Sequence, residues 1–291
     1  MITGTTRICG IMADPVEHSM SPVMQNFYGK VTGKDFAYIP MKVKEEQVEA
    51  AIKGAYAMNF LGMNVTVPHK QHVIKYLKEI DKTAEMIGAV NTLVRTDGGF
   101  KGYNADAAGL YRSMEEKGFP LEGASCILLG AGGAARAAAC VFMEHGAGEV
   151  FILNRNRTRG EELAADMNRL AGRKVFTAMG LSDYGKIPEG KYICIQSTSV
   201  GMHPHDEEAL IEDKSFYDKI SYGMDVVYTP LETRFMKLVR HGGGQAYNGL
   251  DMLVYQGIIA YELWNPDVKI GPEAVNEARR LLICQLEGNR P

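Results

Sequence analysis

Two residues of this chain stand at positions where side chains often transfer protons. In the stretch from Asn64 to Lys70, an alternating strand pattern ends in polar residues and a proline, which is where a fold presents side chains to a ligand. Lys70 at this end is either a proton donor or a solvated cation at the start of a helix. Asp106 follows the turn that begins at Gly102, and it is either the acid-base partner of such a lysine or the N-cap of the next helix.

A glycine-rich turn between a strand pattern and a helix pattern carries a second kind of chemistry. The six residues from Gly130 to Ala135 match the Gly-x-Gly-x-x-Ala form of the dinucleotide fingerprint. Gly130 would make the tight turn, Gly132 would let the backbone approach a pyrophosphate, and free amides at the helix start would face the anion. An ordinary glycine turn has the same letters, but the flanking strand and helix favour a dinucleotide cofactor.

The residues after the next strand indicate which dinucleotide is bound. An NAD site carries a carboxylate there for the ribose hydroxyl, whereas this chain has three arginines and no carboxylate between Asn154 and Arg159. The planar guanidinium groups of Arg155 and Arg157 suit the extra phosphate of NADP. Arg159 fits a solvated surface position better. The sequence therefore favours NADP over NAD, and a nicotinamide cofactor restricts the chemistry to hydride transfer.

A serine pair offers a place for a small carboxylate. Ser21 precedes Pro22 and predicts a helix start with serine as the N-cap, but Ser19 has no such explanation. Two hydroxyls and the free amides of a helix N-terminus form a neutral pocket that suits an anion. The sequence therefore predicts a small acidic substrate bound without a strong positive field.

Composition excludes other functions. The chain has 32 Lys and Arg against 35 Asp and Glu, a net charge of −3, so nothing favours nucleic acid or an anionic membrane as partner. The five scattered cysteines predict reduced core thiols of a cytoplasmic protein. No apolar segment predicts a membrane span or signal peptide. His69 with His72, predicted on one helix surface, and His203 with His205, predicted in a loop, lack the pattern of a metal site.

Two series of alternating strands and helices must position these residues, which predicts an α/β fold in two domains. The expected first series contains four strands (8–12, 36–41, 63–67 and 89–94) and three helices (21–30, 45–58 and 69–78), in a mostly parallel sheet. The expected second series has strands at 125–129, 150–153, 192–195 and 224–227. Two C-terminal helices (251–264 and 272–286) should return to the first domain. We therefore expect a domain of residues 1–106 completed by 250–291, and a second of 107–249.

Taken together, the chain resembles the shikimate/quinate dehydrogenase family over nearly its whole length. The resemblance lies in seven ordered motifs besides the glycine turn: 18–22, 64–70, 88–92, 102–106, 154–155, 197–202 and 248–257. It implies an N-terminal α/β substrate domain and a Rossmann-type NADP-binding domain. The implied reaction is the reversible reduction of 3-dehydroshikimate by NADPH to shikimate, a step toward chorismate and the aromatic amino acids, in a monomer or homodimer.

The resemblance also implies roles for individual residues. The catalytic pair would be Lys70 and Asp106. The substrate contacts would be Ser19, Ser21, Thr66, Asn91, Tyr228 and Gln256. The cofactor contacts would be Gly130, Ala131, Gly132, Gly133, Ala134, Asn154, Arg155, Arg157, Val226 and Gly249.

Three positions depart from the pattern of the family. Ala105 stands where Thr is usual, Gln196 where Asn is common, and Asp251 where a glycine often occurs. Asp251 would lie toward the nicotinamide and could change how the cofactor sits. Two other functions fit the same motifs: a quinate/shikimate dehydrogenase that uses NAD or NADP, and a non-catalytic NADP-binding regulator. A folate dehydrogenase of similar plan fits less well, because the serine pair suits a small carboxylate better than a pterin.

Overall fold

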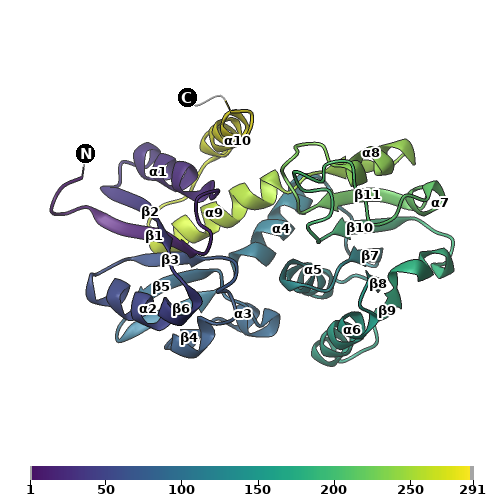
Figure 1. The fold of residues 1–291 in the computed structure, drawn as a ribbon, viewed down its shortest axis with the longest axis horizontal. Helices are drawn as coiled ribbons and strands as arrows, with labels where there is room; N and C mark the ends of the chain where they lie inside the picture. Colours follow the sequence, from purple (N-terminus) through teal and green to yellow (C-terminus); the bar gives the residue numbers. More distant parts are fainter. Residues whose placement is uncertain (1, 289–291) are drawn as a thin grey trace. The chain divides into compact units, whose positions relative to one another are not determined.

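The computed structural model describes residues 2–288 and confirms the expected α/β architecture (Figure 1). The chain forms two compact units: one runs to Gly109 and resumes at Val254, and the other extends from Leu110 to Leu253. These divisions fall three and four residues beyond the expected boundaries. They lie inside two helices, α4 (Ala105–Glu116) and α9 (Leu250–Trp264), so each unit contains part of both helices.

The first unit is built on a six-stranded sheet with the order β2-β1-β3-β5-β6-β4. Its strands are β1 (Arg7–Ala13), β2 (Phe36–Lys42), β3 (Gly62–Val65), β4 (Glu79–Ile80), β5 (Thr92–Thr96) and β6 (Gly99–Tyr103). The sheet is mostly parallel, as predicted: β1 pairs in parallel with β2 and β3, and β4 with β6, whereas β5 runs antiparallel to both neighbours. The reason is the tight turn at Gly98 (φ 78°), because a connection that short joins only antiparallel strands.

The reversal of β5 brings four polar segments to one edge of this sheet. The carboxyl ends of β1, β3 and β6 lie at the edge where β5 begins, since these three strands run parallel to one another and opposite to β5. The segments that follow β1, β3 and β6, and the residue that precedes β5, therefore meet there. They carry Ser19, Thr66, Asp106 and Asn91.

Helices cover both faces of the first sheet. They are α1 (Ser21–Val31), α2 (Val48–Ala57, after the 3₁₀ turn Glu45–Gln47), α3 (Lys82–Ile87), the first unit's part of α9, and α10 (Pro272–Leu286). Side chains of β1 alternate between the two cores, as strand geometry requires. Met12 packs in the cluster that contains Phe100, and Cys9 in the cluster that contains Trp264.

The helix predicted over residues 69–78 is wrong. The chain makes turns from Val67 to Val73 and then a single 3₁₀ turn, Ile74–Tyr76. The carbonyl of Lys70 accepts a hydrogen bond from the backbone N–H of Val90 at 2.8 Å, and the N–H of Ile74 donates to the carbonyl of Gln71 at 3.3 Å instead, so the α-helical ladder does not continue. His69 is consequently buried rather than on a helix surface.

The second unit contains a parallel six-stranded sheet in the order β12-β11-β10-β7-β8-β9. Its strands are β7 (Ser125–Leu129), β8 (Glu149–Asn154), β9 (Phe176–Gly180), β10 (Tyr192–Gln196), β11 (Ile220–Asp225) and β12 (Gln245–Tyr247), with helices α5 (Gly133–Glu144), α6 (Arg157–Ala171), α7 (Lys214–Tyr217) and α8 (Arg234–His241) and a 3₁₀ helix, Leu181–Lys186. β8 lies on one side of β7 and β10 on its other side, so the direction in which strands are added to the sheet reverses beside β7. Ligands of doubly wound sheets bind at the carboxyl ends beside such a switch point.

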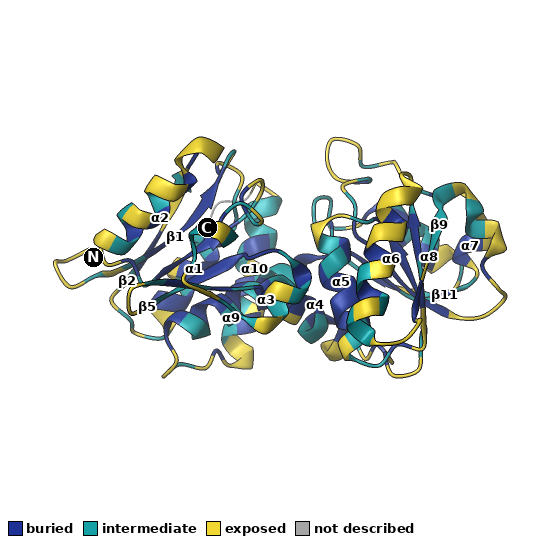
Figure 2. Ribbon diagram, turned by 90° about the horizontal axis from the view of Figure 1, so that it is seen from below, coloured by how far each residue is buried: buried dark blue, intermediate teal, exposed yellow. Residues whose placement is uncertain are grey.

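Burial follows the layers of each unit. Figure 2 shows the central strands, such as β1, mostly in the buried colour, and exposed residues along the outer sides of α2 and α6. Four cysteines are buried and Cys284 is half-buried, and all five are free, as expected for core thiols. Within residues 2–288, no helix has both the length and the apolar character that crossing a bilayer requires.

Candidate functional site

Lys70 and Asp106, predicted as partners from different motifs, form an ion pair at the edge of the first sheet. Lys70 Nζ donates to Asp106 Oδ2 at 2.7 Å, with side chains 29% and 18% exposed. The alternative role for Asp106 is wrong, because the N-cap of α4 is Asn104, whose Oδ1 accepts from the backbone N–H groups of Asp106 (3.0 Å) and Ala107 (3.3 Å). Asp106 Oδ1 has no hydrogen-bond partner among the described residues, so it stays open to a ligand.

The backbone on both sides of Lys70 is fixed by tertiary contacts. Before it, the ring Nε2 of buried His69 lies 2.7 Å from the carbonyl of Val43, and the His69 N–H donates to Thr66 O at 2.9 Å. After it, the Lys70 carbonyl accepts from Val90. The ammonium is therefore carried on a backbone held at three points, which favours a fixed position for Nζ.

Asn91 can present only a donor to a ligand. Its Oδ1 accepts from the backbone N–H of Ala105 at 2.8 Å and from the Thr92 hydroxyl at 2.9 Å. A backbone N–H can only donate, so the amide oxygen must face Ala105 and the NH₂ group must face the other way. Ala105 contributes its backbone alone to this contact, which explains why the departure from Thr leaves the arrangement intact.

The start of α1 differs from the prediction. Ser21 is the first helical residue and Met20 occupies the N-cap position without a side-chain bond, so Ser21 does not cap the helix. The Ser19 hydroxyl instead accepts from the Ser21 N–H at 3.3 Å. One turn later, fully buried Gln25 donates through Nε2 to the carbonyl of Gly257 at 2.8 Å, which ties α1 to the residue after Gln256 on α9.

In the second unit, the glycine turn lies where β7 ends. Gly130 has φ +115°, and a Cβ on it would lie 2.7 Å from Ser197 Oγ, so both conformation and space require glycine. A Cβ on Gly132 or Gly133 would meet nothing within 4 Å, and α5 begins at Gly133. The first amides of α5, with Ala131 and Ala134 beside them, thus lie along open space where an anion could approach.

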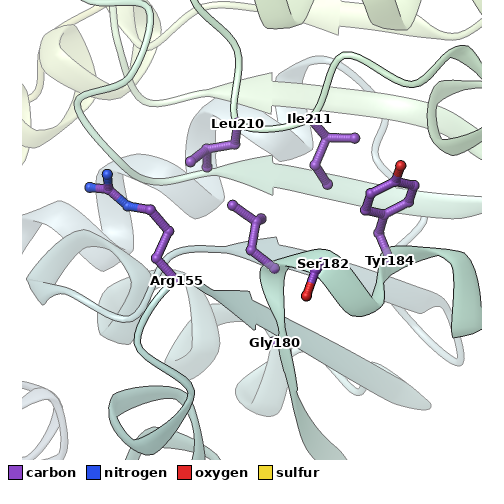
Figure 3. Close-up of a pocket in the computed structure, with 7 residues that line it drawn as sticks. Arg155, Gly180, Ser182, Tyr184, Leu210 and Ile211 are labelled. Carbon is purple, nitrogen blue, oxygen red and sulfur yellow. The ribbon is translucent and has the colours of Figure 1, made fainter.

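A cavity of about 420 Å³ opens at the carboxyl ends of β8 and β9 (Figure 3). It is lined by Arg155, Gly180, Leu181, Ser182, Tyr184, Leu210 and Ile211. Arg155 is exposed and has no ion-pair partner among the described residues, whereas exposed Arg157 pairs with Glu161 at 2.9 Å. Asn154 ends β8, and its Nδ2 donates to Asn156 O at 2.8 Å.

The remaining predicted cofactor residues follow β11 and β12. A Cβ on Gly249 would lie 2.1 Å from Val226 O, so only glycine fits there. Tyr228 is half-buried, and burial raises the pKa of its hydroxyl, which keeps the phenol neutral. Asp251 pairs with Lys117 at 3.0 Å in a largely buried position, so its charge is balanced within the second unit.

The sequence did not reveal the residues that hold these side chains. Tyr38 donates to Asn64 Oδ1 at 2.6 Å, and Asn64 Nδ2 donates to Thr92 Oγ1 at 3.1 Å, which orients the partner of Asn91. Ser182 and Tyr184 of the cavity follow β9, a strand that was not predicted. Polar residues inside apolar strand patterns, such as Asn64, were the one available signal.

Metal ligation finds no support in residues 2–288, where no group of three or more His, Cys, Asp or Glu side chains could hold an ion. His203 pairs with Asp206 at 3.2 Å and His205 with Glu208 at 3.1 Å, in the predicted loop.

Comparison with known proteins agrees with this arrangement. The family models match at residues 11–93 (shikimate dehydrogenase substrate binding domain) and 113–211 (shikimate / quinate 5-dehydrogenase). The shikimate dehydrogenase (NADP(+)) of Methanothermobacter thermautotrophicus is 40% identical, over 91% of this chain and 93% of its own. A crystal structure of a shikimate dehydrogenase in complex with NADP+ matches with a TM-score of 0.88 and 35% sequence identity. The crystal structure of shikimate 5-dehydrogenase from Listeria monocytogenes, in complex with shikimate and NAD, matches with a TM-score of 0.88 and 31% identity. Each match covers 97% of this chain and 98% of the other chain. The chain therefore belongs to the shikimate dehydrogenase family.

Proposed function

We propose that this chain reversibly reduces 3-dehydroshikimate to shikimate with NADPH, a step toward chorismate and the aromatic amino acids. It would be an NADP-dependent oxidoreductase acting on a CH–OH group. The observation that carries the proposal is the 2.7 Å pair of Lys70 and Asp106, because a member of this family that kept only cofactor binding would not need an acid-base pair at the sheet edge.

The second unit fits NADP. The amides at the start of α5, with Gly130, Gly132 and Gly133, would hold the pyrophosphate, since a helix N-terminus and an open glycine backbone suit an anion. Arg155 and Arg157 would meet the 2′-phosphate next to the cavity of Figure 3. Ala131, Ala134, Asn154, Val226 and Gly249 complete the proposed contacts. Bound NADPH supplies the hydride.

Lys70 is the proposed proton donor. Its ammonium would hydrogen-bond the substrate carbonyl and polarise it, and then give up a proton to the oxygen as the alcohol forms. In the reverse direction, neutral Lys70 would accept that proton. Asp106 would orient the ammonium and stabilise its charged form, because an opposite charge this close favours the protonated lysine.

Neutral donors are proposed to hold the substrate. Ser19 and Ser21, with the amides at the start of α1, would bind the carboxylate, and the NH₂ group of Asn91 would donate to a ring hydroxyl. Thr66, Tyr228 and Gln256 are the other proposed contacts. We assign residues 1–106 and 250–291 to substrate binding, and 107–249 to NADP.

Initial rates with shikimate or quinate, each with NADP+ or NAD+, test the proposal. We expect kcat/KM for shikimate with NADP+ to exceed the other three combinations by at least tenfold. A preference for quinate would make the chain a quinate dehydrogenase. NADPH binding without turnover of either substrate would indicate a regulator.

Replacement of Arg155 tests the cofactor assignment. We predict that Arg155→Ala raises KM for NADP+ about tenfold or more and leaves KM for NAD+ within twofold, because only NADP+ carries the phosphate that the guanidinium would bind. Arg169→Ala removes an exposed arginine of α6 and is the matched control. Equal losses with both cofactors would contradict the assignment.

The cellular setting is also a proposal. The free, mostly buried cysteines support a cytoplasmic enzyme, and the proposed substrate is a small molecule. A monomer or homodimer is expected, which light scattering during gel filtration would distinguish.

A further inference from the structure

A buried carboxylate ends β11. Asp225 is fully buried, and no lysine or arginine pairs with it among the described residues. Three donors satisfy it: Thr233 Oγ1 donates to Oδ2 at 2.7 Å, and the Val227 N–H (3.0 Å) and Gln196 Nε2 (3.2 Å) donate to Oδ1. Burial raises the pKa of Asp225 to about 7. Burying a carboxylate without a cation is costly, so the three hydrogen bonds must offset that cost.

Gln196 is the side chain that joins this carboxylate to the neighbouring loop. It ends β10 and is buried, and its Nε2 also lies 3.1 Å from the carbonyl oxygens of both Thr198 and Val200, so its two N–H groups are shared among these carbonyls and Asp225. Its Oε1 accepts from the N–H (2.7 Å) and the hydroxyl (2.8 Å) of Thr198. One side chain thus sets the course of residues 197–200 and connects them to Asp225.

This loop borders the glycine turn. The Ser197 hydroxyl and N–H both donate to Leu129 O, at 2.6 and 2.9 Å, and Gly130 would clash with Ser197 and Thr198 if it carried a Cβ. A shift of residues 197–200 would therefore change the space at the turn.

Backbone hydrogen bonds also connect Gln196 to the segment after β11. The Val226 N–H donates to Gln196 O at 2.9 Å, and the Gly249 N–H donates to Val227 O at 3.0 Å. Gly249 packs directly on Val226. The Gln196–Asp225 pair is thus connected to the glycine turn on one side and to Val226 and Gly249 on the other.

We propose that Gln196 and Asp225 are positioning residues for the dinucleotide, which hold residues 197–200 and 226–228 at a fixed spacing beside the switch point of the second sheet. Neither side chain needs to touch the cofactor. The inference rests on the proposed NADP function and assigns a task to Gln196, the residue that departs from the family pattern.

The test removes the hydrogen bonds of Gln196 while keeping its length. Gln196→Met should raise Kd for NADPH, measured by nucleotide fluorescence, and KM for NADP+ by tenfold or more, with KM for shikimate within twofold of wild type. Gln47→Met, on an exposed glutamine of the first unit, is the matched control. A folded Gln196→Met protein with a Kd for NADPH within twofold of the control would overturn the inference.

A second variant decides the matter if Gln196→Met does not fold. Thr233→Val removes one donor to Asp225 and keeps the side-chain shape. It should raise Kd for NADPH about threefold without changing KM for shikimate, and an unchanged Kd would overturn the inference. Wild-type turnover of shikimate with NADP+ is measured first. Its absence is a failure of the proposed function, whereas wild-type turnover with unaffected variants is a failure of the inference alone.

Discussion

At the scale of single residues, hydrogen bonds already made within the protein decide what each site side chain can offer. The side-chain oxygen of Asn91 already accepts hydrogen bonds from Ala105 and Thr92. One carboxylate oxygen of Asp106 accepts from Lys70, and the other remains open to a ligand. A ligand at this edge therefore meets a neutral donor from Asn91 and a cation and an acceptor from the ion pair. That combination suits an alcohol or carbonyl with neighbouring hydroxyls.

The role of Lys70 can be tested directly. Lys70→Ala should lower kcat by about a hundredfold or more, the usual contribution of a positioned acid-base group, with a much smaller change in KM. Lys53→Ala removes an exposed lysine that forms an ion pair with Glu49 within α2, and it should leave kcat unchanged. A near-normal kcat for Lys70→Ala would refute the role.

The fixed orientation of Asn91 gives a second prediction. Asn91→Asp keeps the oxygen that Ala105 needs but replaces the outward NH₂ by a carboxylate oxygen. The lost donor and the added charge should raise KM for shikimate at least tenfold, with less effect on KM for NADP+. Asn59→Asp, at an exposed position, provides the comparison. If KM for shikimate does not respond, Asn91 does not face the substrate.

At the scale of elements, the sequence predicted most reliably those whose determinants are local. β7 and α10 have the predicted bounds, because neighbouring residues alone define them. β7 is an apolar run that ends before a glycine, and α10 begins at a proline and ends before a glycine. The helix over 69–78 was wrong because its backbone bonds elsewhere: the Lys70 carbonyl accepts from Val90, twenty residues away, and the Ile74 N–H donates to Gln71. β6 was missed because its two glycines resemble a loop. Lys70 and Asp106 were predicted, whereas Gln196 and Asp225 became a pair only when β10 and β11 were aligned.

The cap of α4 links an element to the site. Asn104→Ala removes the bonds to the N–H groups of Asp106 and Ala107, which should lower the free energy of unfolding by about 1 kcal/mol. Because Asp106 lies in the freed turn, kcat should also fall several-fold. Asp81→Ala removes the cap of α3, and it should reduce stability in urea without reducing kcat. A normal kcat for Asn104→Ala would show that the ion pair alone positions Asp106.

At the scale of the whole molecule, the two units differ in how deeply they bury charged groups. The first unit keeps the Lys70–Asp106 ion pair partly exposed, whereas the second buries Asp225 completely. An aspartate whose folded pKa is raised holds its proton in the native state after the unfolded chain has released it. Stability is then fully present below the unfolded pKa and falls as pH rises toward the folded value.

Unfolding at two pH values tests this consequence. Between about pH 4 and the folded pKa of about 7, stability should fall by about 4 kcal/mol on account of Asp225, since each pKa unit is worth about 1.4 kcal/mol. Asp225→Asn imitates the protonated form and should lack this loss. In urea unfolding, the variant should therefore gain more over wild type at pH 8 than at pH 5. An equal difference at both pH values would count against a raised pKa.

The cavity at the ends of β8 and β9 has a practical consequence for redesign. It is lined partly by Arg155, an exposed residue of a surface loop, and β9 is the edge strand of its sheet. Substitutions at exposed positions usually change stability by less than about 0.5 kcal/mol. On the proposed assignment of Arg155 and Arg157 to the 2′-phosphate, substitutions at these two positions would change the choice between NADP and NAD without disturbing the packed core, so that cofactor preference would evolve, or be engineered, independently of the fold.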